Sequence, residues 1–588
     1  MPTVRIPLVG TYNERGIDGS SSLAVPEDQR FLNCVFSVVQ NPVTGKATVY
    51  VEKRPGWGVD SVVSANNPST GLIKPLTYTV PVTAFGDTNS TIYVGSTSVG
   101  TITGRALHFK ETLVSSVSHV MIKSSDGTGW YYVAGAKDQT SYTGNRTSGS
   151  AVISSIASTA GMYSGQAISG TGIPAGARIL TVDSGTQITL DANATSGSGT
   201  STTLTKEPIA KVLDTDFITT GSYISSFEEM DGFLFYVTDD GNVRNSDLNS
   251  VTAYTNTNYV AAQISPDPAV GVVRQKNYLI VFGSASKEAF INGGNATGSP
   301  LQRVPQAFEN IGALDQRSIK SMEDVIYFVS TPRNGDVGVY RIKALQAEKI
   351  SPPSIDKIIG TFTATGGSVY ANAFRLGGYP YLGLFVSTAT EGPSSLLLQE
   401  SGDHVLLESG DDIILESNSS EVSSFVRMLV YNIGLNIWSE WDCSEATFIE
   451  GGSGGVANVL WATSRVETGG KIYTINPAAN GQLWRDDGSS YSMEIRTSKI
   501  DHGTNKRKYV HEIRLVADKQ STGTVTLEKS DDDYATWQTI GTFDLTSDMD
   551  FHIARCGSYK GGRAYRMTHS ANAAFRAEAI EIDYSVES

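Results

Sequence analysis

One pentapeptide in the sequence has the spacing of a catalytic serine. Gly451-Gly452-Ser453-Gly454-Gly455 fits GxSxG, the turn that holds a nucleophilic serine between a strand and a helix in many hydrolases. That turn also requires an acid and a histidine later in the chain. Glycines and strand-forming residues flank this serine, so we interpret the pentapeptide as a flexible loop. The motifs HExxH, GxxxxGK(S/T) and GxGxxG are absent, and we predict no catalytic residue.

A second motif is typical of a fold rather than of a reaction. Residues 530–537, SDDDYATW, resemble the Asp-box S-x-D-x-G-x-T-W of sialidase-like propellers, with Tyr534 in place of the glycine. In those enzymes the box is a hairpin remote from the catalytic site. Its Ser and Asp side chains bond backbone amides, and the Trp packs beneath the turn. The motif is therefore a structural signal, and glycan cleavage stays open only as an alternative.

Metal and thiol chemistry find little support in the residue spacing. The three cysteines, Cys34, Cys443 and Cys556, are far apart and odd in number, so they predict neither a disulfide framework nor a CxxC metal site. The seven histidines lack metal-ligand spacing. Seven carboxylates between Glu400 and Glu421 are of the type that binds calcium, but their spacing matches no calcium loop and favours a solvated acidic edge. We predict no metal and no cofactor.

A basic cluster stands out in an acidic chain. The formal net charge is −15, which excludes electrostatic nucleic-acid binding by the chain as a whole. Cations nonetheless gather near the start of residues 491–588, and four of them are our candidates for docking an acidic partner or a DNA backbone. These candidates are Lys506, Arg507, Lys508 and Arg514. A solvated face without a partner is the alternative.

The composition predicts an all-β protein. Of 588 residues, 39% are hydrophobic and 18% are charged, and 59 are glycine, which is typical of strands joined by tight turns. Helical periodicity is nearly absent, apart from a short helix predicted at residues 354–359 with Ser354 as its N-cap. The start of the chain lacks the apolar segment of a secretory signal, and no apolar run approaches 18 residues. We therefore expect neither a signal peptide nor a membrane helix.

Aromatic-rich strands recur along the chain at a regular spacing. Strands that begin at Phe233, Tyr278, Val325, Tyr381 and Val459 are separated by 45, 47, 56 and 78 residues. The longest step contains a low-complexity stretch of 25 residues, and 53 residues are left without it. A period of roughly 35–56 residues predicts a β-propeller of six or seven blades, because one blade cannot bury both of its faces alone. A run of unrelated β-meanders is the alternative.

These signals divide the chain into a propeller-like core with inserted and C-terminal β-domains. A Gly/Ser/Thr-rich stretch with Gly-Pro turns predicts an accessory β-domain, and an eight-residue ESGD repeat predicts a projecting β-arm. The expected parts are an N-terminal β segment at residues 1–90, the propeller at 91–138, 206–395 and 421–490, the accessory domain at 139–205, the acidic arm at 396–420, and the C-terminal β-domain at 491–588.

A family pattern is carried by residues 30–57 and by about 225–445, and it is faint after 490. It consists of Asn33, Arg54, Pro55, Gly56, Phe282, Gly283, Glu288, Phe290, Gly293 or Gly294, Gln306 and Gly312, with the segments 325–329, 338–359 and 430–442. This pattern resembles the tail hub, or nozzle, proteins of short-tailed bacteriophages, also called packaged-DNA stabilisation proteins. The matching residues are structural, so no catalytic residue is carried over.

The resemblance implies a mechanical function. Proteins of this family form a ring, typically of six subunits, that extends the DNA channel below the portal and its adaptor, the head-to-tail connector. The ring helps to retain the packaged genome and anchors tail spikes, fibres or a plug. The resemblance thus implies a structural virion protein without enzymatic activity, made in the host cytoplasm, with transient, non-specific DNA contact and no membrane partner. It also implies ring or adaptor contacts for the N-terminal β segment at residues 1–90. A receptor- or carbohydrate-binding tail component is the alternative, followed by the glycan-cleaving propeller.

Overall fold

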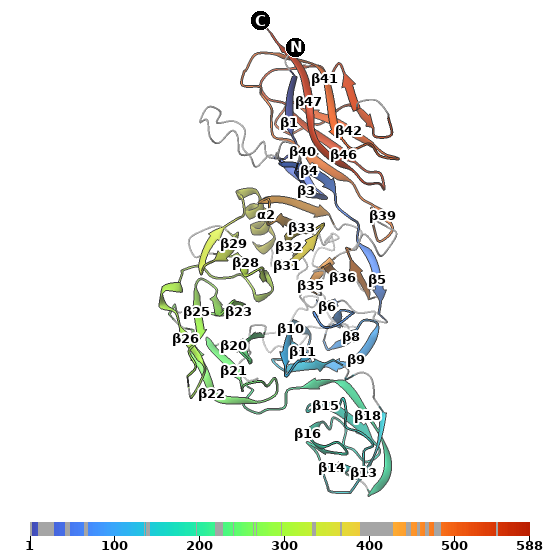
Figure 1. The fold of residues 1–588 in the computed structure, drawn as a ribbon, viewed down its shortest axis with the longest axis vertical. Helices are drawn as coiled ribbons and strands as arrows, with labels where there is room; N and C mark the ends of the chain where they lie inside the picture. Colours follow the sequence, from blue (N-terminus) through green and yellow to red (C-terminus); the bar gives the residue numbers. More distant parts are fainter. Residues whose placement is uncertain are drawn as a thin grey trace, which may run out of the picture.

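Strands dominate the computed structural model of the chain, and α2 (Pro353–Ala364) is the one α-helix in its described part (Figure 1). The structure describes residues 3–9, 29–40, 47–63, 69–86, 88–134, 136, 141–195, 197–217, 227–238, 240–262, 264–265, 267–295, 297–331, 337–364, 367–387, 427–442, 448–454, 459–464, 470–475, 484–547 and 551–587. The predicted acidic arm at 396–420 lies outside these residues.

Five separate four-stranded sheets lie in a ring in the middle of the molecule (Figure 1). Within the described residues they are β6 (Ser69–Ile73), β7 (Val82–Phe85), β8 (Ser90–Val94) and β9 (Thr97–Ile102); β19 (Glu228–Met230), β20 (Phe233–Val237), β21 (Asn242–Ser246) and β22 (Tyr254–Ala261); β23 (Ala269–Gln275), β24 (Tyr278–Gly283), β25 (Lys287–Asn292) and β26 (Leu301–Arg303); β27 (Ile319–Met322), β28 (Val325–Ser330), β29 (Gly338–Lys343) and β30 (Gln346–Lys349); and β35 (Phe448–Gly454), β36 (Val459–Ser464) and β37 (Lys471–Thr474) with β5 (Gly58–Val62). The predicted all-β fold with a propeller arrangement is confirmed.

Two further groups of four strands are continued into nine-stranded sheets. The first is β10 (Ala106–Val114), β11 (Val117–Ser124), β12 (Gly129–Val133) and β18 (Gly199–Lys211), and the second is β31 (Ser368–Leu376), β32 (Tyr379–Ser387), β33 (Arg427–Asn432) and β34 (Ile437–Asp442). Five separate sheets in the described residues are fewer than the six or seven blades predicted. The physical reason is that these two meanders share their outer edges with strands from elsewhere in the chain.

The ring closes through the first strand of each meander. Strand β6 contacts β10, β10 contacts β19, and the contacts continue through β23, β27, β31 and β35 back to β6. The last sheet takes its outer strand from the start of the chain, since β5 pairs antiparallel with β37 and places Val62 opposite Lys471. The two ends of the propeller segment thus pair in one sheet, and this pairing closes the ring.

A small β-module is inserted between β12 and the end of β18. Its strands are β13 (Ser141–Arg146), β14 (Val152–Ser154), β15 (Gln166–Gly170), β16 (Ile179–Ser184) and β17 (Gln187–Leu190). The long strand β18 pairs with β13 and β15 in the module and, at Ala210, with Tyr131 of β12 in the propeller. The module has its own buried core, which includes Ile153, Ile188 and Leu204. One shared strand therefore joins it to the ring, below which it lies in Figure 1.

The two ends of the chain meet in a β-sandwich at the opposite end of the molecule (Figure 1). One sheet contains β3 (Cys34–Gln40), β4 (Ala47–Lys53), β47 (Arg576–Val586), β41 (Lys508–Ala517), β44 (Phe551–Ala554), β1 (Thr3–Pro7) and β45 (Ser558–Tyr559). The other continues from β34 as β2 (Arg30–Leu32), β40 (Met493–Arg496), β46 (Ala564–His569), β42 (Thr524–Ser530) and β43 (Gln538–Asp544). Phe36, Leu527 and Ile580 are buried between the sheets. The strands within residues 1–90 therefore take part in four different sheets.

The predicted short helix is longer than the sequence indicated. Helix α2 (Pro353–Ala364) begins one residue before Ser354, so Ser354 lies inside the first turn and is not the N-cap. Proline suits the first helical position because its missing N–H has no partner there. Ile355 and Ile359 are buried against the propeller. Two 3-10 turns, η2 (Pro305–Ala307) and η3 (Gln316–Ser318), connect the sheets before β27.

Candidate functional site

The GxSxG pentapeptide lies in a strand. Residues 448–454 form β35, and Gly452 is paired with Trp461 of β36. The interpretation of this segment as a flexible loop is wrong for Gly451 to Gly454, while Gly455 lies outside the described residues. A nucleophile elbow needs a helix directly after the serine, and the next described element is β36. Within the part of the chain that the structure describes, no group of three or more His, Cys, Asp or Glu is placed to hold a metal.

The turn between β42 and β43 has the hydrogen bonds expected of an Asp-box. The Tyr534 amide donates to Ser530 Oγ at 3.0 Å, and the Thr536 amide donates to Asp532 Oδ1 at 3.0 Å. Hydrogen bonds from Thr536 and Ser530 lower the pKa of Asp532 to about 2. Tyr534 takes the place of the glycine with a φ of 67°, a left-handed conformation that glycine adopts more readily. The motif stabilises an exposed hairpin of the sandwich.

Three of the four predicted docking cations lie at the surface of the sandwich. Lys506 and Arg507 are exposed in the turn before β41. Arg507 Nη1 donates to Ser558 Oγ at 3.3 Å. The Arg514 side chain is 45% exposed, and its Nε donates to Glu512 Oε1 at 2.8 Å. These three cations are accessible to a partner, and their docking role stays a prediction.

Lys508 does not face solvent, in contrast to its neighbours. It begins β41 on the same side of the strand as Val510, which packs into the sandwich core. Its side chain is fully buried. The ammonium donates to the carbonyl oxygen of Thr504 and, at 2.7 Å, to that of Gly561. Burial lowers the pKa of Lys508. The cation therefore fastens a loop to the sheet, and its inclusion among the docking candidates is corrected.

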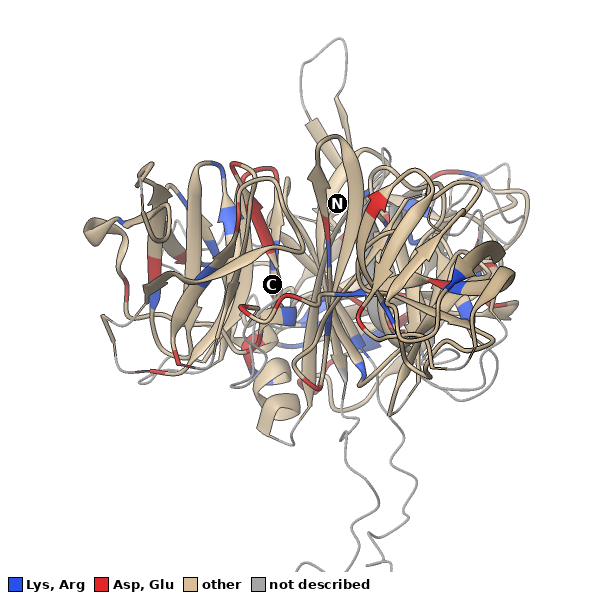
Figure 2. Ribbon diagram, turned by 90° about the horizontal axis from the view of Figure 1, so that it is seen from below, with Lys and Arg blue, Asp and Glu red and all other residues tan. Residues whose placement is uncertain are grey.

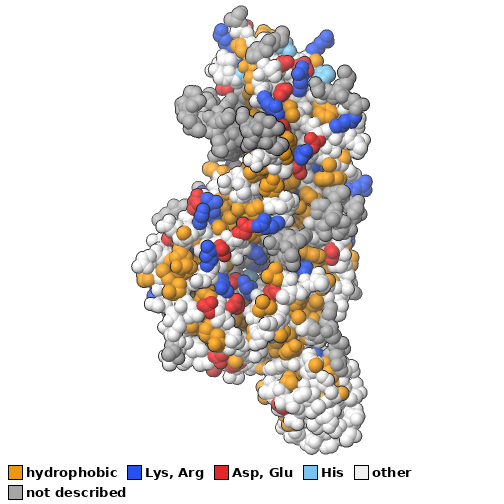
Figure 3. Space-filling model, viewed as in Figure 1, with side chains coloured by type: hydrophobic (Ala, Val, Ile, Leu, Met, Phe, Trp, Pro, Cys, Tyr) orange, Lys and Arg blue, Asp and Glu red, His pale blue; other side chains and the backbone are white. Residues whose placement is uncertain are grey.

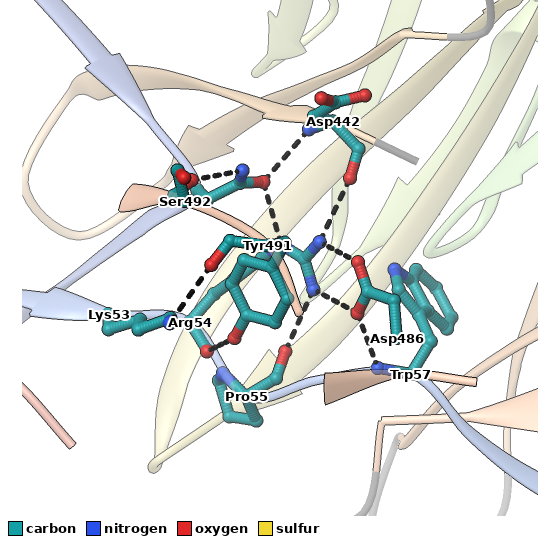
Figure 4. A network of polar contacts seen from close by, with 9 residues as sticks. Lys53, Arg54, Pro55, Trp57, Asp442, Asp486, Tyr491 and Ser492 are labelled. Atoms are coloured by element: carbon teal, nitrogen blue, oxygen red, sulfur yellow. Dashed lines mark hydrogen bonds and ion pairs between the residues drawn. The ribbon is translucent and has the colours of Figure 1, made fainter. Parts of the chain in front are cut away.

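A buried arginine joins the sandwich to the propeller (Figure 4). The Arg54 side chain is 0% exposed. Its Nε donates to Asn33 Oδ1 at 2.9 Å, and its two terminal nitrogens form a bidentate pair with Asp486, one of them at 2.9 Å. These nitrogens also donate to the carbonyl oxygens of Pro55 at 3.0 Å and Asp442 at 2.9 Å. One guanidinium thus holds residues from β34, from the chain ahead of β3 and from the short hairpin β38 (Arg485–Asp486) and β39 (Ser489–Ser490).

The surroundings of Arg54 explain the family pattern at residues 33 and 54–56. The Trp57 amide donates to Asp486 Oδ1 at 2.9 Å, so this carboxylate also fixes the entry to β5. The ring of Tyr491 lies 4.0 Å from the guanidinium carbon. A Cβ atom on Gly56 would stand 1.9 Å from the carbonyl oxygen of Arg485, which only glycine permits. These residues are structural, as the sequence indicated.

A groove of about 830 Å³ separates the sandwich from the propeller. Its walls are Val9 and Phe31 on one side and Ile355, Ile358 and other residues of the helix and β34 on the other. Near it, the Arg30 guanidinium binds both carboxylate oxygens of Glu440, at 3.1 and 2.9 Å. Residues 10–28, which connect two of the lining residues, lie outside the described part of the chain. We therefore assign the groove no ligand.

Charged side chains gather near the centre of the propeller (Figure 3). They line a cavity of about 190 Å³ bounded by β6, β10, β19, β23, η3, β27 and β31. Lys110 Nζ donates to both carboxylate oxygens of Glu228, at 2.8 and 2.7 Å. Lys320 lines the same cavity. Enclosure by protein and the charge of Lys110 lower the pKa of Lys320 to about 8, although Glu228 acts in the opposite direction.

A second set of charges lies beside the first. Arg317 Nε donates to Asp315 Oδ1 at 3.2 Å, and its Nη1 donates to the Tyr370 hydroxyl at 2.9 Å. Burial and the charge of Lys123 lower the pKa of His108 to about 3, so this imidazole is neutral near pH 7. Sequence reasoning missed all of these residues. Their one sequence signal is a charged residue in or beside the first strand of a four-stranded repeat.

The axial cavity is too small for duplex DNA. A cube of about 190 Å³ has sides of roughly 6 Å, whereas the major groove of B-DNA alone is about 12 Å wide. The Lys110–Glu228 ion pair and Tyr370 also line this cavity. In the ribbon of Figure 2, positions of acidic and of basic residues are both spread over the described part of the chain. Among the described residues, this cavity therefore leaves no room for a duplex.

The fold defines a β-propeller protein with a β-sandwich built from both ends of the chain. A family model described as "Bacteriophage P22 Gp10, beta-propeller" matches residues 176–372, about a third of the chain. The chain is similar to the tail hub protein gp10 of Salmonella phage P22, with 30% identity over 105 residues that make up 18% of this chain and 22% of that protein. The match thus spans about a fifth of the relative's length. The resemblance to phage tail hub proteins is confirmed over the matched residues.

Two solved structures were also compared with the chain. The computationally designed Ika8 protein has 8% identity and a TM-score of 0.32, with 71% of this chain and 99% of that chain covered. The Pan2 WD40 domain of Neurospora crassa has 7% identity and a TM-score of 0.35, with 73% and 97% covered. These scores are too low to support an argument about fold or function.

Proposed function

We propose that this chain is a structural virion protein, a subunit of a ring-shaped tail hub that extends the DNA channel below the portal and its adaptor. The observation that carries the proposal is the family match over residues 176–372, which includes β19 to β30 and therefore three complete sheets of the ring. In this function the ring helps to retain the packaged genome and anchors tail spikes, fibres or a plug. The protein is made in the host cytoplasm and then incorporated into the virion.

The size of the axial cavity supports a channel between subunits rather than through one propeller. A duplex that cannot enter a cavity of about 190 Å³ must pass through the space that several subunits enclose. Six copies would carry a formal charge of about −90, which disfavours tight adhesion of DNA to the wall. Subunit contacts in such a ring are heterologous, and their rotation must close after six copies.

The exposed cations of the sandwich are proposed to dock an acidic neighbour in this assembly. Lys506, Arg507 and Arg514 supply the charge, and Lys508 is left out because it is buried. In the described residues, no helix is long and apolar enough to cross a membrane.

The proposal is tested by deleting the gene from its phage and imaging the particles of the lysate by electron microscopy. Emptied heads with short or missing tails, restored to full infectious particles by the gene supplied from a plasmid, would support the hub function. Full heads with complete tails that fail to adsorb would contradict it and favour a receptor- or carbohydrate-binding component. Complementation with a Lys506→Glu and Arg507→Glu variant then tests docking, since unchanged assembly at low salt contradicts that role.

A further inference from the structure

We propose that the cavity at the propeller axis binds a small oxyanion, a phosphate or a carboxylate, through Lys320, Lys110 and Asn372. The site lies within one subunit and does not depend on assembly into a ring. It therefore goes beyond the proposed function and can be tested on the isolated chain.

The first observation is an excess of positive charge on the cavity wall. Lys110 is neutralised by Glu228, which it contacts through both carboxylate oxygens. Lys320 makes no ion pair or hydrogen bond with any described residue, yet it is close enough to both groups to feel their charges. Two ammonium groups thus share one carboxylate. Since an enclosed charge without a counterion is costly, an anion beside Lys320 would stabilise the wall.

The second observation is a buried donor without a partner. Asn372 of β31 lines the cavity, and its side chain is 1% exposed. Its Nδ2 has no hydrogen-bond partner among the described residues. A buried amide that donates no hydrogen bond loses the bonds it would make to water. An oxyanion accepts hydrogen bonds only, so once the Asn372 amide turns toward it, it would satisfy this donor and the Lys320 ammonium together.

The size and rigidity of the cavity limit the ligand. A liquid water molecule occupies roughly 30 Å³, so about 190 Å³ holds a tetrahedral phosphate or a short dicarboxylate with a few waters. Arg317 is fixed at the wall by its bond to the Tyr370 hydroxyl, which places a further cation near the ligand. A metal cation is disfavoured because the wall has more cations than carboxylates. A duplex is too wide to enter the cavity, as argued above.

Protonation of Lys320 links binding to pH. With a pKa of about 8, this ammonium is mostly charged at pH 7 and loses its proton as the pH rises. The charged groups that face it are Lys110 of β10 and Glu228 of β19. Arg317 and the neutral His108 lie along the same cavity. We therefore expect affinity for the oxyanion to fall between pH 7 and pH 9.

The test measures binding of inorganic phosphate and of malonate to the full chain by calorimetry at pH 7, with sodium chloride at matched ionic strength as the blank. We expect at least one of the two anions to bind. Lys320→Met should weaken that binding tenfold or more, and Asn372→Leu should weaken it severalfold. Lys276→Met is the matched control, because Lys276 lies on the propeller with a side chain 65% exposed and pairs with Asp324. Its affinity should stay within twofold of the parent chain.

The outcomes separate the ligand classes and can overturn the proposal. Binding of phosphate alone assigns a phosphoryl ligand, and binding of malonate alone assigns a carboxylate. If neither anion binds more tightly than chloride, the proposal is wrong. Unchanged affinity in Lys320→Met also overturns it. If that variant fails to fold, Asn372→Leu and the loss of affinity from pH 7 to pH 9 decide the question. Failure of the hub function in the phage leaves this result untouched.

Discussion

Replacing Arg54 by methionine should loosen the junction between the sandwich and the propeller. The guanidinium makes hydrogen bonds to two side chains and two backbone carbonyls, and methionine makes none of them. The side chain of Asp486 is only 5% exposed, so its charge would remain buried without its cation. Removal of one partner from a buried ion pair costs about 3–5 kcal/mol. Domains are typically stable by about 5–15 kcal/mol, so this loss is large.

The assay is urea unfolding of the purified chain, followed by tryptophan fluorescence and by limited proteolysis between the two domains. Two probes are needed because a chain of this size need not unfold in one step. Arg514→Met is the matched control, since this arginine is 45% exposed and forms a surface ion pair with Glu512. Surface pairs of this kind contribute about 0–1 kcal/mol.

A double variant separates the ion pair from the carbonyl contacts. Arg54→Met with Asp486→Leu removes both charges but leaves the carbonyl oxygens of Pro55 and Asp442 without the donors described above and the Trp57 amide without its acceptor. Each unsatisfied buried acceptor costs about 1–3 kcal/mol. The double variant should therefore be more stable than Arg54→Met and less stable than the parent. A loss below 1 kcal/mol in Arg54→Met would refute the reasoning, as would a double variant that is the least stable of the three.

Three further predictions concern groups with displaced pKa values or strained turns. His569 is buried with no hydrogen bond at either ring nitrogen in the described structure, and burial and Lys53 lower its pKa to about 4. The unfolded chain thus binds more protons between pH 4 and 6.5, so stability rises with pH in this range, and His569→Phe should flatten this rise and raise the melting temperature. Lys53, Lys123 and Lys320 have pKa values near 8, mainly through burial. Between pH 8 and 9.5 the unfolded chain again holds more protons, so urea midpoints should rise with pH, and Lys53→Met should reduce that slope. Asp532→Ala should speed hydrogen exchange in the β42–β43 turn while leaving the midpoint of global unfolding nearly unchanged, because the turn is exposed.

The strands could be predicted from the sequence because their signals are local. The aromatic-rich segment at 325–329 lies in β28. This strand pairs with β27, which precedes it in the chain, and with β29, which follows it. The edges of two meanders could not be predicted, since β34 pairs in parallel with β2, with Leu32 opposite Glu440. Register between segments so far apart depends on the whole fold. For this reason the sequence indicated separate blades where the structure has shared sheets.

Among the candidate site residues, too, some could be placed from the sequence and others could not. Lys508 could have been placed inside from its sequence, because it alternates in step with Val510 at the start of β41. We grouped it with its neighbours by charge instead. The axial residues could not be found, because Lys110, Glu228 and Lys320 come from three strands that only ring closure brings together. Each of them alone is an ordinary charged residue in a strand.

The shared sandwich has a consequence for synthesis on the ribosome. Strand β4 ends at Lys53, and its partner β47 begins at Arg576, 523 residues later. At about 5–20 residues per second, β4 waits roughly 25–105 s for that partner to emerge. The sheets from β6 to β30 pair with near neighbours and can form in order during this time. The arginine junction forms only after Asp486 has been made, and the sandwich only after β47, so products truncated before Asp486 lack both.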